Sequence, residues 1–174
     1  VGAITNETGL TNASIGAIEI ADRFSLVEAA SEHADNIIQA LRGTKLRYAQ
    51  LDSCKLNDAD LERANLSHAD LVDSQLGGMK ARSANFSRAV LQRADMSEAE
   101  LHDANFEGAS LEEAILTGAL AERALFNEAD LSRAKLDRAN FSAADLRKAI
   151  LTGASLRGTQ LTGAHLHSTE LGAD

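Results

Sequence analysis

The most regular feature of the sequence is an apolar residue at every fifth position from Leu46 to Leu171, unbroken over 26 units. The central residue of a unit is usually Leu, with Phe in four units, Met in one and Ala in two. Two positions before each centre lies a small residue, mostly Ala, and the other three positions are mostly polar. A period of five fits neither an α-helix nor a flat strand, so the chain must turn a corner in every unit.

The repeated units themselves point to a family. ADLER, ANLSH and ADLVD (residues 59–73) and ANFSR (residues 84–88) resemble the A(D/N)LXX motif of pentapeptide-repeat proteins, and the resemblance covers about three quarters of the chain. It implies an all-β solenoid, a right-handed, four-sided parallel β-helix in which four units make one coil. The centre and the small residue would point inward and the other three positions outward. Residues 44–174 would then form 6.5 coils.

The charges support a coil of four units without reference to any family. Equivalent residues, 20 apart in the sequence, would stack about 4.8 Å apart in neighbouring strands, where opposite charges attract and like charges repel. Signs alternate wherever both neighbours are charged. The columns are Asp73–Arg93–Glu113–Arg133, Glu62–Arg82–His102–Glu122 and Asp60–Lys80–Glu100.

Among the inward positions that depart from the usual Leu and Ala, three bear on packing or on reactivity. Ala81 and Ala121 occupy central positions, and each is followed by a phenylalanine, Phe86 or Phe126, which we expect to fill the space that a missing Leu would leave. Cys54 takes a position that usually holds Ala, so we expect a small buried side chain rather than a reactive thiol.

The segment before the repeat, residues 1–43, has a different pattern. Ser25 and Glu28 form a capping box, and apolar residues then recur at helical spacing as far as Gly43. This pattern predicts an amphipathic α-helix over residues 26–42 that caps the open end of the β-helix. Residues 1–23 hold apolar residues five apart in another frame, which fits either degenerate units or an irregular strand.

Composition excludes several classes of function. The net charge of −9 and the pI of about 5.0 argue against direct nucleic-acid binding. No stretch has the roughly 18 consecutive apolar residues that a membrane span needs. We therefore expect a soluble protein without nucleic-acid or membrane contacts, with the cytoplasm favoured as its compartment.

The sequence shows almost no arrangement of residues that could form a catalytic site. His165 and His167 share an outward face, but they lack the third and fourth ligands of a zinc site. No glycine-rich phosphate loop precedes a helix, and a β-helix with a filled interior has no pocket of its own. The sequence therefore predicts no enzyme activity, no catalytic residue, no metal and no cofactor.

The charges are uneven among the four sides, which we name after their first central residues. The Leu46 side holds five basic and three acidic residues, whereas the Leu51 side is strongly acidic. Only Arg93 and Arg133 interrupt the acidic residues of the Leu51 side, which are Asp52, Asp70, Asp73, Glu112, Glu113, Asp130 and Glu170. Such a side resembles that of the family members that imitate DNA, bind gyrase and protect it from quinolones, although the two arginines fit a salt-bridge ladder better.

Apolar residues also occur where the repeat should face water. They are Ile115, Leu120 and Leu125 on three successive sides of one coil, and Val90 and Ile150 on the Leu51 side. Either an outward strand position simply tolerates aliphatic residues, or these residues form a candidate interaction surface for a protein partner.

The far end of the repeat shows no cap in this sequence. The coil around Leu156, Leu161, Leu166 and Leu171 would expose apolar centres and unpaired strands, which favours a homodimer through the C-terminal coils or a longer natural chain. We predict a non-enzymatic protein-binding or scaffold module whose partner the sequence does not identify. The alternative is a DNA-mimicking, gyrase-binding protein.

Overall fold

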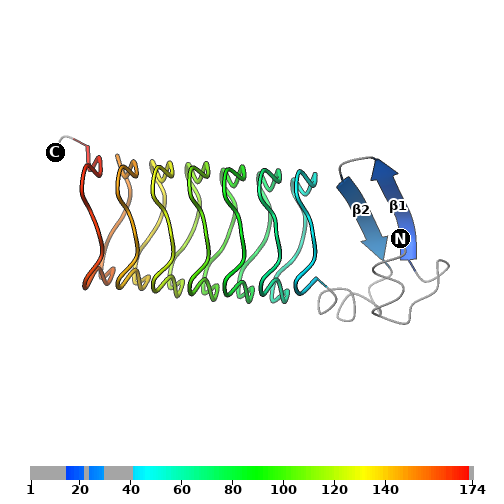
Figure 1. Cartoon of the computed structure of the whole chain (residues 1–174), viewed down its shortest axis with the longest axis horizontal. Helices are drawn as coiled ribbons and strands as arrows, with labels where there is room; N and C mark the ends of the chain where they lie inside the picture. The colour runs from blue at the N-terminus through cyan, green and yellow to red at the C-terminus, as the bar shows by residue number, and fades with distance from the viewer. Residues whose placement is uncertain (1–14, 22–23, 30–40, 173–174) are drawn as a thin grey trace.

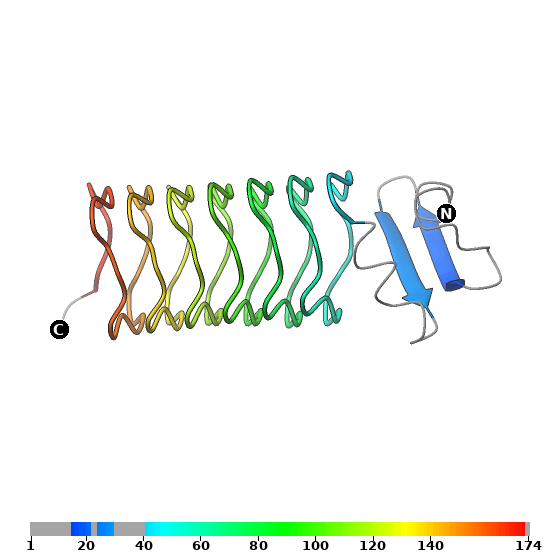
Figure 2. The ribbon, with the colours of Figure 1, turned by 90° about the horizontal axis from the view of Figure 1, so that it is seen from below.

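A computed structural model of the chain describes residues 15–21, 24–29 and 41–172. Residues 41–172 form a stack of coils that runs along the long axis of the molecule (Figure 1). A hairpin of two strands, β1 (Ile15–Ala21) and β2 (Phe24–Ala29), lies beyond the first coil in both ribbon views (Figures 1 and 2).

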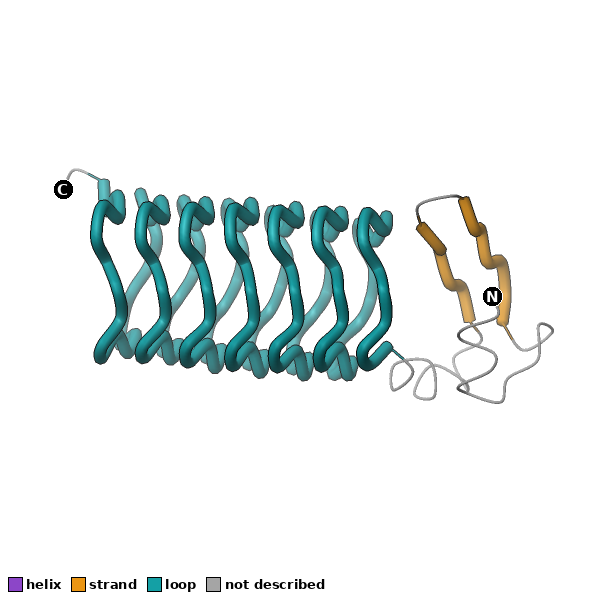
Figure 3. Tube along the Cα trace, viewed as in Figure 1, coloured by secondary structure: helices purple, strands orange, loops and turns teal. Residues whose placement is uncertain are grey.

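The coils are joined by a parallel ladder in which each unit pairs with the fourth unit after it. The outward residue before each centre bridges its equivalent in the next coil, from Lys45 with Asn65 to Ile150 with Glu170. Each centre from Leu46 to Leu151 also donates its backbone N–H to the following coil, as in Leu46 to the Asn65 carbonyl at 2.7 Å. Each side contributes one short bridge and no extended strand, which is why Figure 3 draws the coils as loops and turns. The predicted coil length is confirmed.

A tight turn makes each corner. The residue after the corner donates its backbone N–H to the carbonyl of the preceding centre, as in Ala49 to Leu46 at 3.1 Å. The second residue after each centre has a positive φ, and where it is not glycine its φ lies between 54° and 61°. In the four-residue turn that starts at the centre, this residue is the third, and a positive φ at the third residue is the geometry of a type II turn. Every coil therefore places ordinary side chains in a backbone conformation that usually favours glycine.

Leucine, phenylalanine, methionine and alanine fill the interior. From Ala59 to Leu151, every central residue and nearly every alanine two places before it is at most 2% exposed. Phe86, Phe106 and Phe126 stack in three successive coils, with ring centroids 4.8 and 4.7 Å apart. Phe141 tilts against Phe126 at 5.1 Å and follows Ala121 in its own column. Ala81 and Ala121 are fully buried in the same core, and the filling of the space beside them by Phe86 and Phe126 stays a prediction.

Cys54 and Ser74 occupy equivalent inward positions in adjacent coils. Burial raises the pKa of the Cys54 thiol to about 11, so the thiol is protonated at neutral pH and behaves as a small apolar group. Ser74 is 1% exposed, and within the described part of the chain its hydroxyl has no hydrogen-bond partner.

The helix predicted over residues 26–42 is wrong at both of its described ends. Residues up to Ala29 belong to β2, which pairs antiparallel with β1 through Ala21 with Phe24 and Ile18 with Val27. The β-branched and aromatic residues of this segment favour strand pairing over the capping box. Residues 41–43 form the first corner of the β-helix, with Gly43 at the positive-φ position (φ 67°) instead of ending a helix. The middle of the predicted helix, residues 30–40, lies outside the described residues.

The β-helix therefore begins earlier than predicted. Leu41 is 7% exposed and acts as a centre, and the Gly43 N–H donates to the Glu62 carbonyl at 2.8 Å. Residues 41–43, which we expected to precede the repeat, therefore belong to the β-helix. Residues 1–14, for which two conformations were open, lie outside the described residues, whereas 15–21 form a strand of the hairpin and not repeat units.

Candidate interaction surfaces

The outer face of the β-helix carries all of the candidate site residues. Three outward positions per unit project from a filled interior, so polar groups are spread along columns instead of converging. Within residues 15–21, 24–29 and 41–172, no group of three or more His, Cys, Asp or Glu residues could hold a metal ion. In the same residues, no helix is long and apolar enough to cross a membrane.

Ion pairs between adjacent coils form ladders on this outer face. Arg93 is paired with Asp73 through two hydrogen bonds of 2.7 Å, and Arg133 lies 3.1 Å from Glu113. The first predicted column is therefore present as two separate pairs. The hydrogen bond from Arg93 lowers the pKa of the Asp73 carboxyl.

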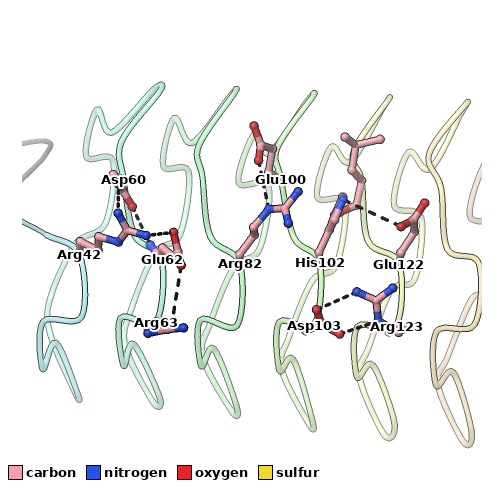
Figure 4. A network of polar contacts seen from close by, with 11 residues as sticks. Arg42, Asp60, Glu62, Arg63, Arg82, Glu100, His102, Asp103, Glu122 and Arg123 are labelled. Carbon is pink, nitrogen blue, oxygen red and sulfur yellow. Dashed lines mark hydrogen bonds and ion pairs between the residues drawn. The ribbon is translucent and has the colours of Figure 1, made fainter.

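The Leu61 side carries a series of polar contacts that spans several coils (Figure 4). Glu62 pairs with Arg42 of the preceding coil. Arg82 instead lies 3.4 Å from Glu100, so the second predicted column is only partly realised. His102 lies 4.0 Å from Glu122 and hydrogen-bonds the Leu120 carbonyl at 2.9 Å.

Further ladders follow the same spacing, although they were not among the predicted columns. Arg123 pairs with Asp103 through hydrogen bonds of 2.8 and 2.9 Å. Lys148 pairs with Glu128 at 2.8 Å. These contacts lower the pKa of both carboxyls. Reading every column from one coil to the next would have found both pairs.

The acidic Leu51 side is not a continuous acidic surface. Arg93 and Arg133 pair with three of its seven acidic residues, including Glu112, which contacts Arg133. The carboxylates of Asp70 and Asp130 are engaged locally, because each accepts a hydrogen bond from the backbone N–H two residues later. The column that holds both runs Gln50, Asp70, Val90, Ser110, Asp130, Ile150 and Glu170, so uncharged residues separate its three acids. Asp52 belongs to a different outward column in the first coil of this side.

The five apolar surface residues all occupy the outward bridging position that the sequence predicts. Leu120 and Leu125 are 41% and 40% exposed and project from two neighbouring sides, the Leu61 and Leu46 sides. Val90 is 36% exposed, whereas Ile115 and Ile150 are half-buried. Leu120 and Leu125 therefore lie five residues apart on adjoining sides of one coil, whereas Val90 and Ile150 lie three coils apart in one column.

The Leu46 side has a basic part that the sequence reading did not single out. Its first three coils hold no Asp or Glu at their outward positions, and we call this region the basic strip. Its Tyr48 is 42% exposed, stacks on His68 with ring centroids 4.9 Å apart, and has the Arg47 guanidinium 4.9 Å from its centroid. The strip comprises Lys45, Arg47, Tyr48, Asn65, His68, Asn85, Ser87 and Arg88. Column reading would have placed Tyr48 beside His68.

At the C-terminal end, apolar centres become exposed. Leu156 and Leu161 are half-buried, whereas Leu166 is 41% and Leu171 62% exposed. His165, His167 and Glu170 lie on the same coil, and His167 is exposed there. This end of the described repeat therefore presents apolar surface to water.

A parallel ladder that repeats every four units around a filled core defines a solenoid of the β-helix class. The family model for pentapeptide repeats matches residues 44–78, 69–108, 82–118, 104–142 and 139–172, so the chain belongs to the pentapeptide-repeat family. A second family model, described as the DbpA RNA binding domain, matches residues 1–52.

Several solved structures are similar to this chain. HetL, involved in heterocyst differentiation regulation in the cyanobacterium Nostoc sp. strain PCC 7120, is 31% identical, with 74% of this chain and 73% of that chain covered and a TM-score of 0.43. Rfr23 from the cyanobacterium Cyanothece 51142 is 29% identical, with 74% and 88% covered and a TM-score of 0.55. QnrB1, a plasmid-mediated fluoroquinolone resistance protein, is 19% identical, with 75% and 67% covered and a TM-score of 0.49. The family assignment and the likeness to Rfr23 imply a right-handed β-helix. A comparison with curated proteins gives no match.

Proposed function

We propose that this chain is a non-enzymatic protein-binding module in which the outer surface of the β-helix contacts the partner. The pair Leu120 and Leu125 carries the proposal, because both are about two-fifths exposed and they flank one corner. Polar residues surround them along the columns, with Glu100 and Asn140 beside Leu120. An apolar centre with a polar rim is the usual anatomy of a protein interface.

The proposal includes no catalytic step. The inward positions are occupied by packed apolar side chains, and the outward carboxylates are paired or spaced along the columns. A hydrolase or metal enzyme would need polar groups that converge on a cleft.

Site-specific photo-crosslinking in the native host tests the proposal. A photoreactive amino acid replaces Leu120 or Leu125 in turn, and Ile150, on the Leu51 side, serves as the control position. We expect one discrete adduct with the same protein from positions 120 and 125, and none from 150. Equal adducts from all three positions, or no adduct from any, would contradict the proposal.

The rival function, imitation of DNA toward gyrase, requires a continuous negative surface. Arg93 and Arg133 neutralise the middle of the Leu51 side, and Val90 and Ser110 interrupt its outward column. We therefore expect no effect of micromolar protein on supercoiling by purified gyrase, with or without a quinolone. Inhibition of supercoiling would support the imitation of DNA toward gyrase.

A second candidate function is RNA binding by the N-terminal region. The DbpA RNA binding domain model matches residues 1–52, which include the β1–β2 hairpin and the first units of the β-helix. These residues carry seven acidic and four basic side chains, so any affinity must come from particular contacts and not from overall charge. Fluorescence anisotropy of a labelled single-stranded RNA with the full chain tests this candidate, and an unchanged anisotropy at micromolar protein would exclude it.

We also propose a homodimer through the C-terminal coils. The exposed centres Leu166 and Leu171 support it, because burying them against a second copy would remove apolar surface from water. Light scattering should report a dimer whose fraction rises with concentration and falls in Leu171→Asp. A strict monomer at high concentration would contradict this proposal.

A further inference from the structure

The basic strip combines positive charge with an absence of acidic residues, in a chain where acidic residues outnumber basic ones by 26 to 17. Its three cations are Lys45, Arg47 and Arg88, which all project outward. Glu62, on the adjoining Leu61 side, is already paired with Arg42. Glu107 follows the strip in the fourth coil of the Leu46 side, so the strip ends there. The strip is therefore a local positive surface that the net charge of the chain conceals.

Stacked rings lie inside this positive surface. Tyr48 donates its backbone N–H to the Ser67 carbonyl at 3.1 Å, and this ladder bond holds Tyr48 directly beside His68 in the next coil. The rings are stacked at 4.9 Å with an interplanar angle of 22°, and the Arg47 Nη2 donates to the Tyr48 hydroxyl at 3.1 Å. Exposed aromatic rings beside arginine are a stacking platform for nucleic-acid bases.

The remaining polar groups of the strip are arranged as donors. The Asn65 and Asn85 Oδ1 atoms accept the backbone N–H groups of Ser67 and Ser87 at 3.1 and 2.9 Å. The acceptor atom of each amide is thus engaged, and in the described part of the chain neither Nδ2 donates a hydrogen bond. The strip therefore presents cations, donors and ring faces, which match phosphates, base acceptors and base faces.

We propose that the basic strip binds single-stranded RNA, with Tyr48 and His68 stacking bases and Lys45, Arg47 and Arg88 contacting phosphates. The inference rests on the RNA-binding candidate, because Lys45, Arg47 and Tyr48 lie within the residues that match the RNA binding domain model. It extends the site beyond that match, to His68 and Arg88 in the second and third coils. An acidic peptide would pair with the three cations, but it has no bases to stack on the rings of Tyr48 and His68.

Anisotropy titrations of the full chain with a fluorescein-labelled single-stranded RNA of mixed sequence test this site. The variants are Tyr48→Leu and the triple variant Lys45→Gln/Arg47→Gln/Arg88→Gln. The matched control, Lys135→Gln/Arg138→Gln/Arg157→Gln, makes the same change in charge on the Leu56 side. Circular dichroism melting establishes that each variant is folded.

We expect Tyr48→Leu to weaken RNA binding about 10-fold, the order of one lost stacked base. The triple variant should lower the slope of log affinity against log salt by about 2, since each phosphate contact on a single strand contributes about 0.7. The control should bind like the unsubstituted chain, and poly-glutamate should not compete with RNA at equal charge concentration.

The results distinguish RNA binding by the chain from the location of the site on the basic strip. If the full chain binds RNA and both strip variants bind equally well, the strip is not the site, while the RNA-binding candidate stands. If the full chain does not bind RNA, both are overturned. Equal losses in the strip variant and the Leu56-side control, or full competition by poly-glutamate, would show unspecific anion attraction and overturn the strip.

Discussion

Ala143 provides a sharp test of the corner geometry, because it is an exposed alanine with a φ of 57°. We expect Ala143→Gly to stabilise the protein, whereas Ala→Gly normally destabilises. A left-handed backbone costs an L-residue roughly 1–2 kcal/mol, and the extra freedom of glycine in the unfolded chain costs about 0.4–1 kcal/mol. The methyl group is exposed, so its loss removes little packing. The net gain should be about 0.5–1 kcal/mol, which corresponds to a rise in Tm of about 2 °C.

Two further variants make this prediction decisive when thermal unfolding is followed by circular dichroism. Ser142→Gly changes the preceding turn position, where φ is not positive, and should cost about 0.5–1 kcal/mol. Gly158→Ala places a methyl where φ is 71° and the nearest atom is 3.9 Å away, so it should destabilise through backbone conformation alone. If Ala143→Gly lowers Tm as Ser142→Gly does, the assigned cost of the left-handed corners is wrong.

Three other predictions concern polar groups. Ser74→Ala should stabilise the protein by about 1 kcal/mol in chemical denaturation, because it removes a buried hydroxyl that has no partner in the described part of the chain; a loss of stability would imply a hydrogen bond from that hydroxyl. Glu113→Lys puts three cations in one column and should cost about 0.5–1 kcal/mol at low salt, an effect that added salt should reduce; an unchanged Tm at low salt would refute the repulsion. The lowered carboxyl pKa values of Asp103, Glu128 and Asp145 mean that their stabilisation is present above about pH 4 and is lost as pH falls through the folded values, so Tm should fall steeply only below that pH.

The repeat made most of the fold predictable. A five-residue period fixes which residues face inward, and opposite charges one coil apart fix the coil length, so Leu61, Phe86 and their equivalents are buried as expected. The N-terminal region was not predictable in this way. Its capping box and helical spacing favour a helix locally, but pairing of Ile18 with Val27 across the hairpin depends on residues outside that window.

The candidate surfaces were predictable only where the position of a residue in the five-residue unit decides whether its side chain is exposed. The outward placement of Leu120 and Leu125 follows from their place in the unit. Long charged side chains are different, because Arg82 can reach Glu100 as easily as the acid in its own column. The Tyr48–His68 stack follows the same coil-to-coil rule, but a search confined to charges does not find it.

In this protein, we propose, outward residues make the contacts with the partner and inward residues only maintain the fold. The most direct test is the affinity of the crosslinked partner for Leu120→Asn/Leu125→Asn, measured by calorimetry beside Phe106→Leu, a buried residue in the aromatic stack. We predict that the double variant loses about 10-fold or more in affinity with an unchanged Tm. Phe106→Leu should lower Tm and, below its Tm, keep the affinity. A double variant that binds its partner as tightly as the unsubstituted chain would contradict the account.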